Sequence, residues 1–366
     1  MSIITKLGKF FEKLYSLSNI ARLNKARQDF ISHFIMGMLR SRNVQFCEIA
    51  AQMDTKAKNA SNLRRIQLFF SGYKLDYQQI AMLLILMLPE GDRWRLSIDR
   101  TNWQFGQLDI NYLVVSVSCR GVGIPLWFEL LEDKKRGNSN EKDRISLLRR
   151  VIKLGSSKKM FLYADREFIG KNWVGYLLKQ QVKFFIRLRK STRLLWQKEE
   201  QRADEWLTNK TYLAMDNVFV QDHWLSVALQ KQVTEAKTED DYLIILTNTE
   251  AKGALAAYRD RWSIEVFFQS IKGRGFNIEK THLQDYKRLR KLMAMCAIAF
   301  AIALRVGIIF NDYVKEIKIK NHGYKANSFF RHGLEKIREA MRLNDQFDNI
   351  LELFWLNFKD NKHQFK

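Results

Sequence analysis

The feature that most constrains the fold is the order of short β-rich runs between residues 94 and 188. Three such runs separated by turn signals come first, and a helix, a strand, a second helix and a last strand follow. The expected strands are 94–98, 112–117, 124–130, 160–164 and 182–188, and the expected helices are 140–154 and 169–181. A meander followed by this alternation is the element order of a ribonuclease-H-like fold. We therefore predict an α/β catalytic core of that kind.

The remaining boundaries are placed by changes of residue pattern, because the chain has only two prolines and no low-complexity linker. Helical periodicity predicts a helical domain over residues 1–88, and the surplus of basic residues in this region favours DNA binding. The core is expected over residues 89–190 and 242–310, interrupted at 191–241 by a β-rich insertion with a hairpin of strands 212–220 and 224–230. Residues 311–366 are expected to form a helical region for DNA binding or dimerisation.

The charge of the chain indicates its partner. Lys and Arg total 62 against 39 Asp and Glu, which gives a formal net charge of +23. Such a surface attracts polyanions, so nucleic acid is the first candidate and an acidic membrane surface the second. The apolar run 292–304 is shorter than the roughly 20 residues that span a bilayer, and we expect a buried helix there. Three widely spaced cysteines indicate neither a disulfide framework nor a zinc site, which fits a reducing cytoplasm.

Within the N-terminal region, residues 44–66 could form a helix-turn-helix motif. In that interpretation Ser61 caps the second helix, and Asn62, Arg64 and Arg65 face a DNA groove. A solvated basic helix would explain the same pattern, so both interpretations stay open.

Two aspartates end strands that lie side by side in the expected core. Asp99 follows the first strand and Asp165 follows the fourth. Close carboxylates oppose each other's ionisation unless a cation neutralises them. Two divalent ions with oxygen ligands can do so, and can also activate a water for attack on a phosphodiester. Glu129, on the third strand, could also face this site, although an outward direction is favoured.

Glu265 supplies a third carboxylate. Tyr258, Arg261, Glu265 and Lys272 are separated by three, four and seven positions, which puts them within about a 60° arc of one helix face. Glu265 can then face the metal ions while the other three point toward DNA phosphates. The alternative is an exposed helix with an ordinary Arg261–Glu265 ion pair.

The spacing Tyr258-x2-Arg261-x3-Glu265-x6-Lys272 resembles the signature of the insertion sequence 4 family of transposases. The segments Asp99-Arg100-Thr101 and Asp165-Arg166-Glu167-Phe168 resemble that family's motifs around its two aspartates, and the resemblance covers roughly residues 90–310. It implies a DDE transposase in which Asp99, Asp165 and Glu265 are catalytic and hold two Mg²⁺ ions, with Mn²⁺ as a substitute. The DNA contacts that it implies are Tyr258, Arg261, Lys272, Arg166 and Trp262, to which the N-terminal Arg64 and Arg65 are added.

The resemblance also implies how the reaction proceeds. Such enzymes act as homodimers in a synaptic complex, cut at terminal inverted repeats, form hairpin ends and transfer them to target DNA, here in the bacterial cytoplasm. The family's base-holding tryptophan is missing from the expected strand 242–246, which leaves Trp206, Trp224 and Trp262 as alternatives. A metal-dependent nuclease without strand transfer would use the same carboxylates and is the alternative function. A DNA-binding protein without catalysis is a third interpretation.

Overall fold

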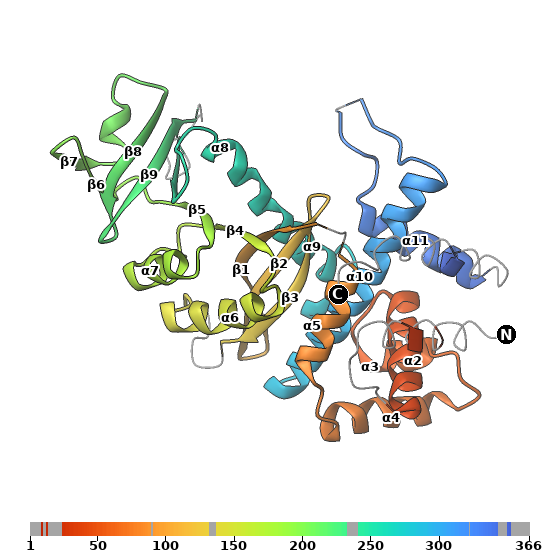
Figure 1. Cartoon of the computed structure of the whole chain (residues 1–366). Coiled ribbons are helices and arrows are strands. Elements are labelled where there is room, and N and C mark those ends of the chain that lie inside the picture. Colours follow the sequence, from red (N-terminus) through yellow and green to blue (C-terminus); the bar gives the residue numbers. More distant parts are fainter. Residues whose placement is uncertain are drawn as a thin grey trace. The chain divides into compact units, whose positions relative to one another are not determined.

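A mixed ten-stranded sheet organises the middle of the chain, with the strand order β3-β2-β1-β4-β5-β10-β9-β8-β6-β7 (Figure 1). The computed structural model describes residue 9 and residues 12–13, 24–88, 91–131, 137–232, 241–321, 323–342 and 350–352. The strands are β1 Arg93–Phe105, β2 Leu108–Cys119, β3 Val122–Leu130, β4 Lys159–Ala164, β5 Lys183–Arg187, β6 Arg193–Trp196, β7 Glu199–Arg202, β8 Tyr212–Val220, β9 His223–Lys231 and β10 Tyr242–Thr247.

The chain divides into two compact units. One comprises residues 1–90, 103–109 and 267–366, and the other comprises residues 91–102 and 110–266. The helices of the first unit are α2 Lys25–Ser41, α3 Phe46–Gln52, α4 Asn59–Gly72, α5 Tyr77–Leu86, α10 Tyr286–Tyr313 and α11 Phe329–Arg342, with a short 3-10 helix η5 at Ile278–Lys280. The five-part domain division expected from the sequence stays a prediction.

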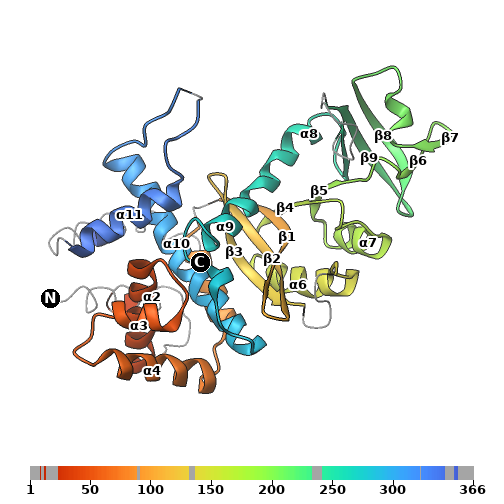
Figure 2. The ribbon, with the colours of Figure 1, turned by 180° about the vertical axis from the view of Figure 1, so that it is seen from behind.

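The first five strands have the ribonuclease-H-like order that the sequence predicts. Short turns join β1, β2 and β3 into an antiparallel meander, and β4 pairs in parallel with β1 on one side and β5 on the other. The crossover helices α6 (Glu141–Leu154) and α7 (Lys171–Lys179) pack against each other and against β3 and β5, as Figure 2 also shows from behind. This part of the fold prediction is confirmed.

β1 is longer than the sequence pattern predicts. Its parallel pairing with β4 ends where Ile98 lies opposite Ala164. The strand nevertheless continues to Phe105 beside β2, with Thr101 and Trp103 buried on one face. Asp99 therefore lies within a strand and not at its end, whereas Asp165 directly follows the last residue of β4.

The insertion extends the same sheet. β10 pairs antiparallel with β5 and with β9, so the hydrogen-bonded ladder runs without a break from the core into the insertion. The predicted hairpin is present as β8 and β9, whose turn residues Gln221 and Asp222 both have left-handed φ values, 55° and 62°. Such a two-residue turn matches the right-handed twist of the paired strands. A 3-10 helix, η2 (Glu205–Leu207), packs beside β7, β8 and β9.

Helix α10 is the core of the first unit. It is long and apolar enough to cross a membrane by length and composition, but its apolar window is fully buried inside the protein. Even its Lys291 is buried, where Nζ donates hydrogen bonds to the carbonyl oxygens of Phe69 and Phe70 at the end of α4. The prediction of a buried helix at residues 292–304 is confirmed.

Candidate active site

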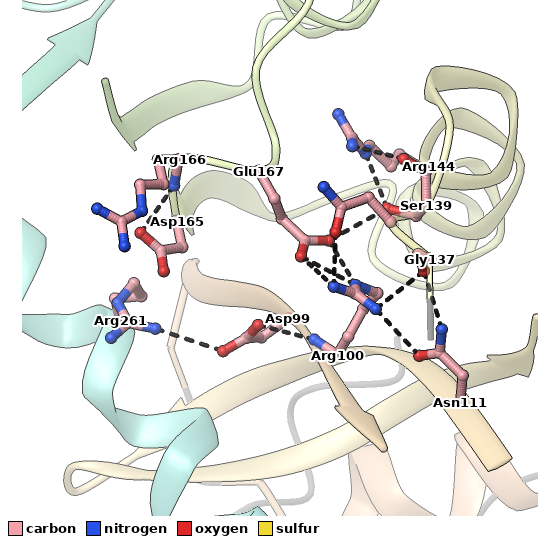
Figure 3. Close-up of polar contacts among 11 residues, drawn as sticks. Asp99, Arg100, Asn111, Gly137, Ser139, Arg144, Asp165, Arg166, Glu167 and Arg261 are labelled. Carbon is pink, nitrogen blue, oxygen red and sulfur yellow. Dashed lines mark hydrogen bonds and ion pairs between the residues drawn. The ribbon is translucent and has the colours of Figure 1, made fainter. Parts of the chain in front are cut away.

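Asp99 and Asp165 continue the register of two neighbouring parallel strands. Each directly follows the last residue of the paired stretch, Ile98 on β1 and Ala164 on β4. Each carboxylate accepts a hydrogen bond of 2.7 Å from the backbone N–H of the next residue, Arg100 or Arg166. Figure 3 shows both carboxyl groups on the side where Arg261 lies. The sheet thus brings together two acidic groups that are 66 positions apart in the sequence.

Arg261 joins the third carboxylate to this pair. Its Nη1 lies 3.3 Å from Asp99 Oδ2 and 3.3 Å from Glu265 Oε1. The side chains of Arg261 and Asp99 are 14% and 16% exposed, so this contact is largely withdrawn from water. Asp99, Asp165, Glu265 and Arg261 all belong to the second unit and influence one another electrostatically.

The segment that carries Glu265 is not the single helix predicted from the sequence. It consists of α8 (Ala254–Ala257), the 3-10 helix η4 (Tyr258–Trp262) and α9 (Ser263–Ile271). The tighter 3-10 geometry turns residues by about 120° each and not by 100°. Tyr258 and Arg261, three positions apart, are therefore nearly eclipsed, and the Arg261 guanidinium lies 5.9 Å from the centre of the Tyr258 ring. The environments of the four signature residues nevertheless differ: Tyr258 lies in the core, Arg261 contacts both Asp99 and Glu265, and Lys272 follows the end of α9.

The carboxylates create an electrostatic conflict. Burial, followed by the negative charges of Glu265 and Asp165, raises the pKa of Asp99 to about 7, against the opposing effects of the Arg100 amide and the Arg261 guanidinium. A nearby cation stabilises the ionised form of such a cluster of carboxylates. In this structure Arg261 provides that cation.

The donor set is suited to a divalent metal ion. Three carboxylates offer only oxygen ligands, which hard cations such as Mg²⁺ prefer. In the part of the chain that the structure describes, no three acidic, histidine or cysteine side chains are already arranged to enclose a cation. Since Arg261 lies between Asp99 and Glu265, its side chain would have to move for the two to share an ion.

Comparison with known protein families identifies the family of the domain that carries these residues. The sequence model described as the transposase DDE domain matches residues 91–302, more than half of the chain. The chain belongs to this family. Such a domain is an enzyme of nuclease and transesterification type that depends on divalent metal ions.

No curated protein matches the chain in sequence. Among solved structures, the chain is similar to a piggyBac transposase synaptic complex with hairpin DNA, determined by cryo-electron microscopy. The TM-score is 0.43 at 12% identity, over 95% of this chain and 82% of that one.

The other two residues of the predicted signature, Tyr258 and Lys272, lie in different environments. Tyr258 is 8% exposed and packs in a cluster with Tyr163, Phe185 and Ile245, so its ring belongs to the core and not to the surface. Burial raises the pKa of its phenol. Lys272, which belongs to the first unit, forms an ion pair of 2.9 Å with Glu279.

Two other predicted contacts flank the acidic residues of the DDE domain. Trp262 is 60% exposed, and the Arg261 guanidinium lies 5.9 Å from the centre of its ring. Arg166 follows Asp165 and lies beside it in Figure 3. Glu129 points away from the site, since its carboxylate accepts a bond from Trp127 Nε1 at 3.0 Å and lies 3.8 Å from Arg150. The loop before α6 ends at Asn140, whose side chain caps that helix.

The N-terminal contacts are only partly as expected. Arg64 and Arg65 are exposed on α4, but Asn62 is 1% exposed and bonds to Thr55 Oγ1 and the Ala50 carbonyl. The expectation that Asn62 faces DNA is therefore wrong, as is the predicted cap. α4 begins two residues before Ser61, with Lys58 at the N-cap.

Sequence reasoning missed an ion pair between two residues that closely follow the aspartates. Arg100 binds Glu167 through three short contacts, and both side chains are largely buried. The signal was present in the motifs, because an Arg and a Glu of opposite charge follow Asp99 and Asp165 closely in the chain.

Proposed function

We propose that this DDE transposase cuts DNA at the terminal inverted repeats of a bacterial insertion sequence of the insertion sequence 4 type and transfers the ends into target DNA. The reaction would follow a cut-and-paste route with hairpin ends. A homodimer would hold the two ends in a synaptic complex in the cytoplasm. The observation that carries the proposal is that Arg261 contacts Asp99 and Glu265 while the β1–β4 register puts Asp165 beside Asp99, all within a domain of this family.

In this proposal Asp99, Asp165 and Glu265 are the catalytic residues and the ligands of two Mg²⁺ ions, for which Mn²⁺ can substitute. Bound there, the ions would activate a water and stabilise the leaving oxygen of the phosphodiester. The three carboxylates supply oxygen ligands only. Because Asp99 is buried, its ionised form is unfavourable without a nearby cation.

Arg261 has two roles in succession. In the DNA-free protein it neutralises Asp99 and Glu265 through contacts of 3.3 Å, which are long for charge-assisted hydrogen bonds. Once metal ions neutralise these carboxylates in place of Arg261, its guanidinium would be available to bind a DNA phosphate beside the cut. A planar guanidinium can hold a phosphate through two parallel bonds, which suits this second role.

The other DNA contacts are proposed around this centre. Arg166 and the exposed Trp262 lie next to acidic residues or to Arg261, and Trp262 is the aromatic side chain that we propose for stacking on an unpaired base. Lys272, Arg64 and Arg65 would bind backbone phosphates. For Tyr258, whose ring is buried, contact with DNA would require the segment 254–262 to open.

The test is incubation of the full chain with DNA that carries the element's own ends and Mg²⁺, followed by mapping of the cut strands. Asp99→Asn, Asp165→Asn and Glu265→Gln should each reduce cleavage by about a thousandfold or more, because each removes a ligand of an ion that contributes several kcal/mol. Binding of the same DNA should persist in a gel-shift assay.

Glu129→Gln is the matched control, since it neutralises a strand carboxylate that pairs with Arg150 outside the site. It should cut normally. Near-normal cutting by any of the three acidic variants would remove that residue from the proposal. Cut ends without joined products or hairpins would identify a nuclease instead.

A further inference from the structure

Asp99 and Arg100 are consecutive residues of one strand and therefore point to opposite faces of the sheet. Asp99 faces Arg261, as does Ser97, whose hydroxyl lies near Asp260 and Ser263 of the same segment. Arg100 faces the loop before α6 and the turn after β4 (Figure 3). Its guanidinium therefore lies on the opposite face of the sheet from Arg261 and from the Asp99 carboxylate.

Among the described residues near the site, Arg100 and Glu167 form the shortest ion pair. Arg100 Nε lies 2.7 Å and 2.9 Å from the two carboxylate oxygens of Glu167, and Nη2 lies 2.6 Å from Oε2. Their side chains are 14% and 17% exposed. Forked, charge-assisted contacts of this length fix direction as well as distance.

The same guanidinium is bound on its remaining edges. Nη1 donates to the Gly137 carbonyl at 3.0 Å, and Nη2 donates to Asn138 Oδ1 at 2.9 Å. Arg144 then anchors this loop to the chain after β4, because it donates to Ser139 and to the Ile169 carbonyl and lies over the ring of Phe168. Arg100 Nη1 also donates to Asn111 Oδ1 of β2 at 3.4 Å, so the guanidinium is held in place from three segments.

The Arg100–Glu167 pair lies just beyond the point where the backbone hydrogen bonding between β1 and β4 ends. β1 and β4 are paired only as far as Ile98 and Ala164, one residue before the two aspartates. Beyond that point β1 continues beside β2, while the chain after β4 makes a turn closed by a bond from Phe168 N to Asp165 O at 2.9 Å. The negative charges of Asp99 and Asp165 repel each other across this point.

We infer that Arg100 and Glu167 are positioning residues that set the separation of the Asp99 and Asp165 carboxylates, and thereby the affinity of the acidic site for divalent metal ions. This inference rests on the proposed function of that site. Arg100 shares a peptide bond with Asp99, and Glu167 lies in the same tight turn as Asp165, so their ion pair ties the two aspartates together from behind. Residues that orient metal ligands in this way change metal affinity by about 10- to 100-fold when substituted.

The experiment measures Mn²⁺ binding to the full chain without DNA, by the electron paramagnetic resonance signal of free Mn²⁺, at a temperature where every variant is folded. Glu167→Gln keeps the shape and removes the charge, whereas Arg100→Lys keeps the charge and removes the fork. Each should weaken Mn²⁺ binding by about tenfold. The double variant should bind no more weakly than either single variant, because the two residues act as a unit.

Asp204→Asn is the control. It breaks the Arg202–Asp204 pair of 2.8 Å in the insertion, and Mn²⁺ affinity should be unchanged. Asp165→Asn should abolish binding. If it does not, the proposed metal site is wrong, whereas loss in Asp165→Asn with normal affinity in Glu167→Gln and Arg100→Lys overturns this inference alone.

A lowered melting temperature with unchanged affinity would likewise overturn it, because the pair would then be structural only. If neither Glu167→Gln nor Arg100→Lys folds, Asn138→Ala is the alternative variant, because it removes one acceptor of Arg100 and leaves the ion pair intact. It should weaken Mn²⁺ binding by about two- to threefold, in line with the loss of one hydrogen bond of about 0.5 kcal/mol. No change in that variant would also contradict the inference.

Discussion

Arg100 and Arg261 approach the same acidic centre from opposite faces of the sheet, but they are bound in different ways. Arg100 makes forked contacts of 2.6 to 2.9 Å with one carboxylate, and loop groups bind its outer nitrogens. Arg261 uses Nη1 for two contacts of 3.3 Å, shared between Asp99 and Glu265. Short, directed hydrogen bonds therefore fix the orientation of Arg100. Arg261 is held mainly by electrostatic attraction to two carboxylates. An arginine of the second kind can exchange its partner at low cost.

Loss of the Arg100 contacts should have the largest effect on stability. Arg100→Met leaves Glu167 without its partner in a largely buried place, and breaking such a pair costs about 3 kcal/mol. Arg261→Met should lower the free energy of unfolding by less than Arg100→Met, because the Arg261 contacts are longer, at 3.3 Å, and because Asp99, whose pKa is raised to about 7, can bind a proton when its partner is lost. Urea unfolding in metal-free buffer measures both. Equal losses would contradict the distinction between the two arginines.

Loss of Arg261 should instead affect catalysis. Arg261→Ala should lower the cleavage rate tenfold or more, because a desolvated, charge-assisted phosphate contact contributes about 1.5 to 3 kcal/mol. Lys272→Ala should show a loss of the same kind. Arg95→Ala is the control, since Arg95 forms an exposed ion pair with the neighbouring Asp260. Normal cleavage with a lowered melting temperature in Arg261→Ala would make that residue structural.

The carboxylate that lies between the two arginines should make stability depend on pH. The pKa of Asp99 is raised from 3.8 to about 7 on folding, so the folded state binds more protons between these values. Its contribution to stability therefore falls as pH rises through this window. In metal-free buffer, the stability of Asp99→Asn relative to the unsubstituted protein should be greater at pH 8 than at pH 5, by about 1 to 2 kcal/mol. An equal difference at both pH values would argue against the electrostatic conflict.

Arg64 and Arg65 extend the comparison to arginines exposed on a helix. Arg64→Ala or Arg65→Ala should weaken binding to all DNA sequences similarly. Each should also reduce the slope of log affinity against log salt by about 1 if one phosphate contact is lost. Gel-shift titrations at several salt concentrations measure this, and an unchanged slope would place the contact elsewhere.

The sequence pattern predicted the order and pairing of the core strands because these depend on local alternation and on general rules of chain connection. The adjacency of β1 and β4, which puts Asp99 beside Asp165, followed from that order. The roles of the three acidic residues stay predictions.

Other features depended on contacts between distant segments. The Arg100–Glu167 pair joins residues 67 positions apart, and no local periodicity indicates it. The break of the signature helix at Tyr258–Trp262 accompanies the burial of Tyr258 against strands of the sheet. Asn62 fits a DNA-facing residue by its position in the motif, but it is bound by Thr55 and the Ala50 carbonyl.

The unbroken ladder from β5 through β10 to β9 limits how the insertion can change in length during evolution. Removal of one residue within β10 would turn its side chains to the other face of the sheet and disturb the buried Ile244 and Ile245. The turn between β6 and β7 has no such constraint, since Gln197 and Lys198 are exposed and already have left-handed φ values. Extra residues, or a fused peptide tag, are therefore best accepted at that turn.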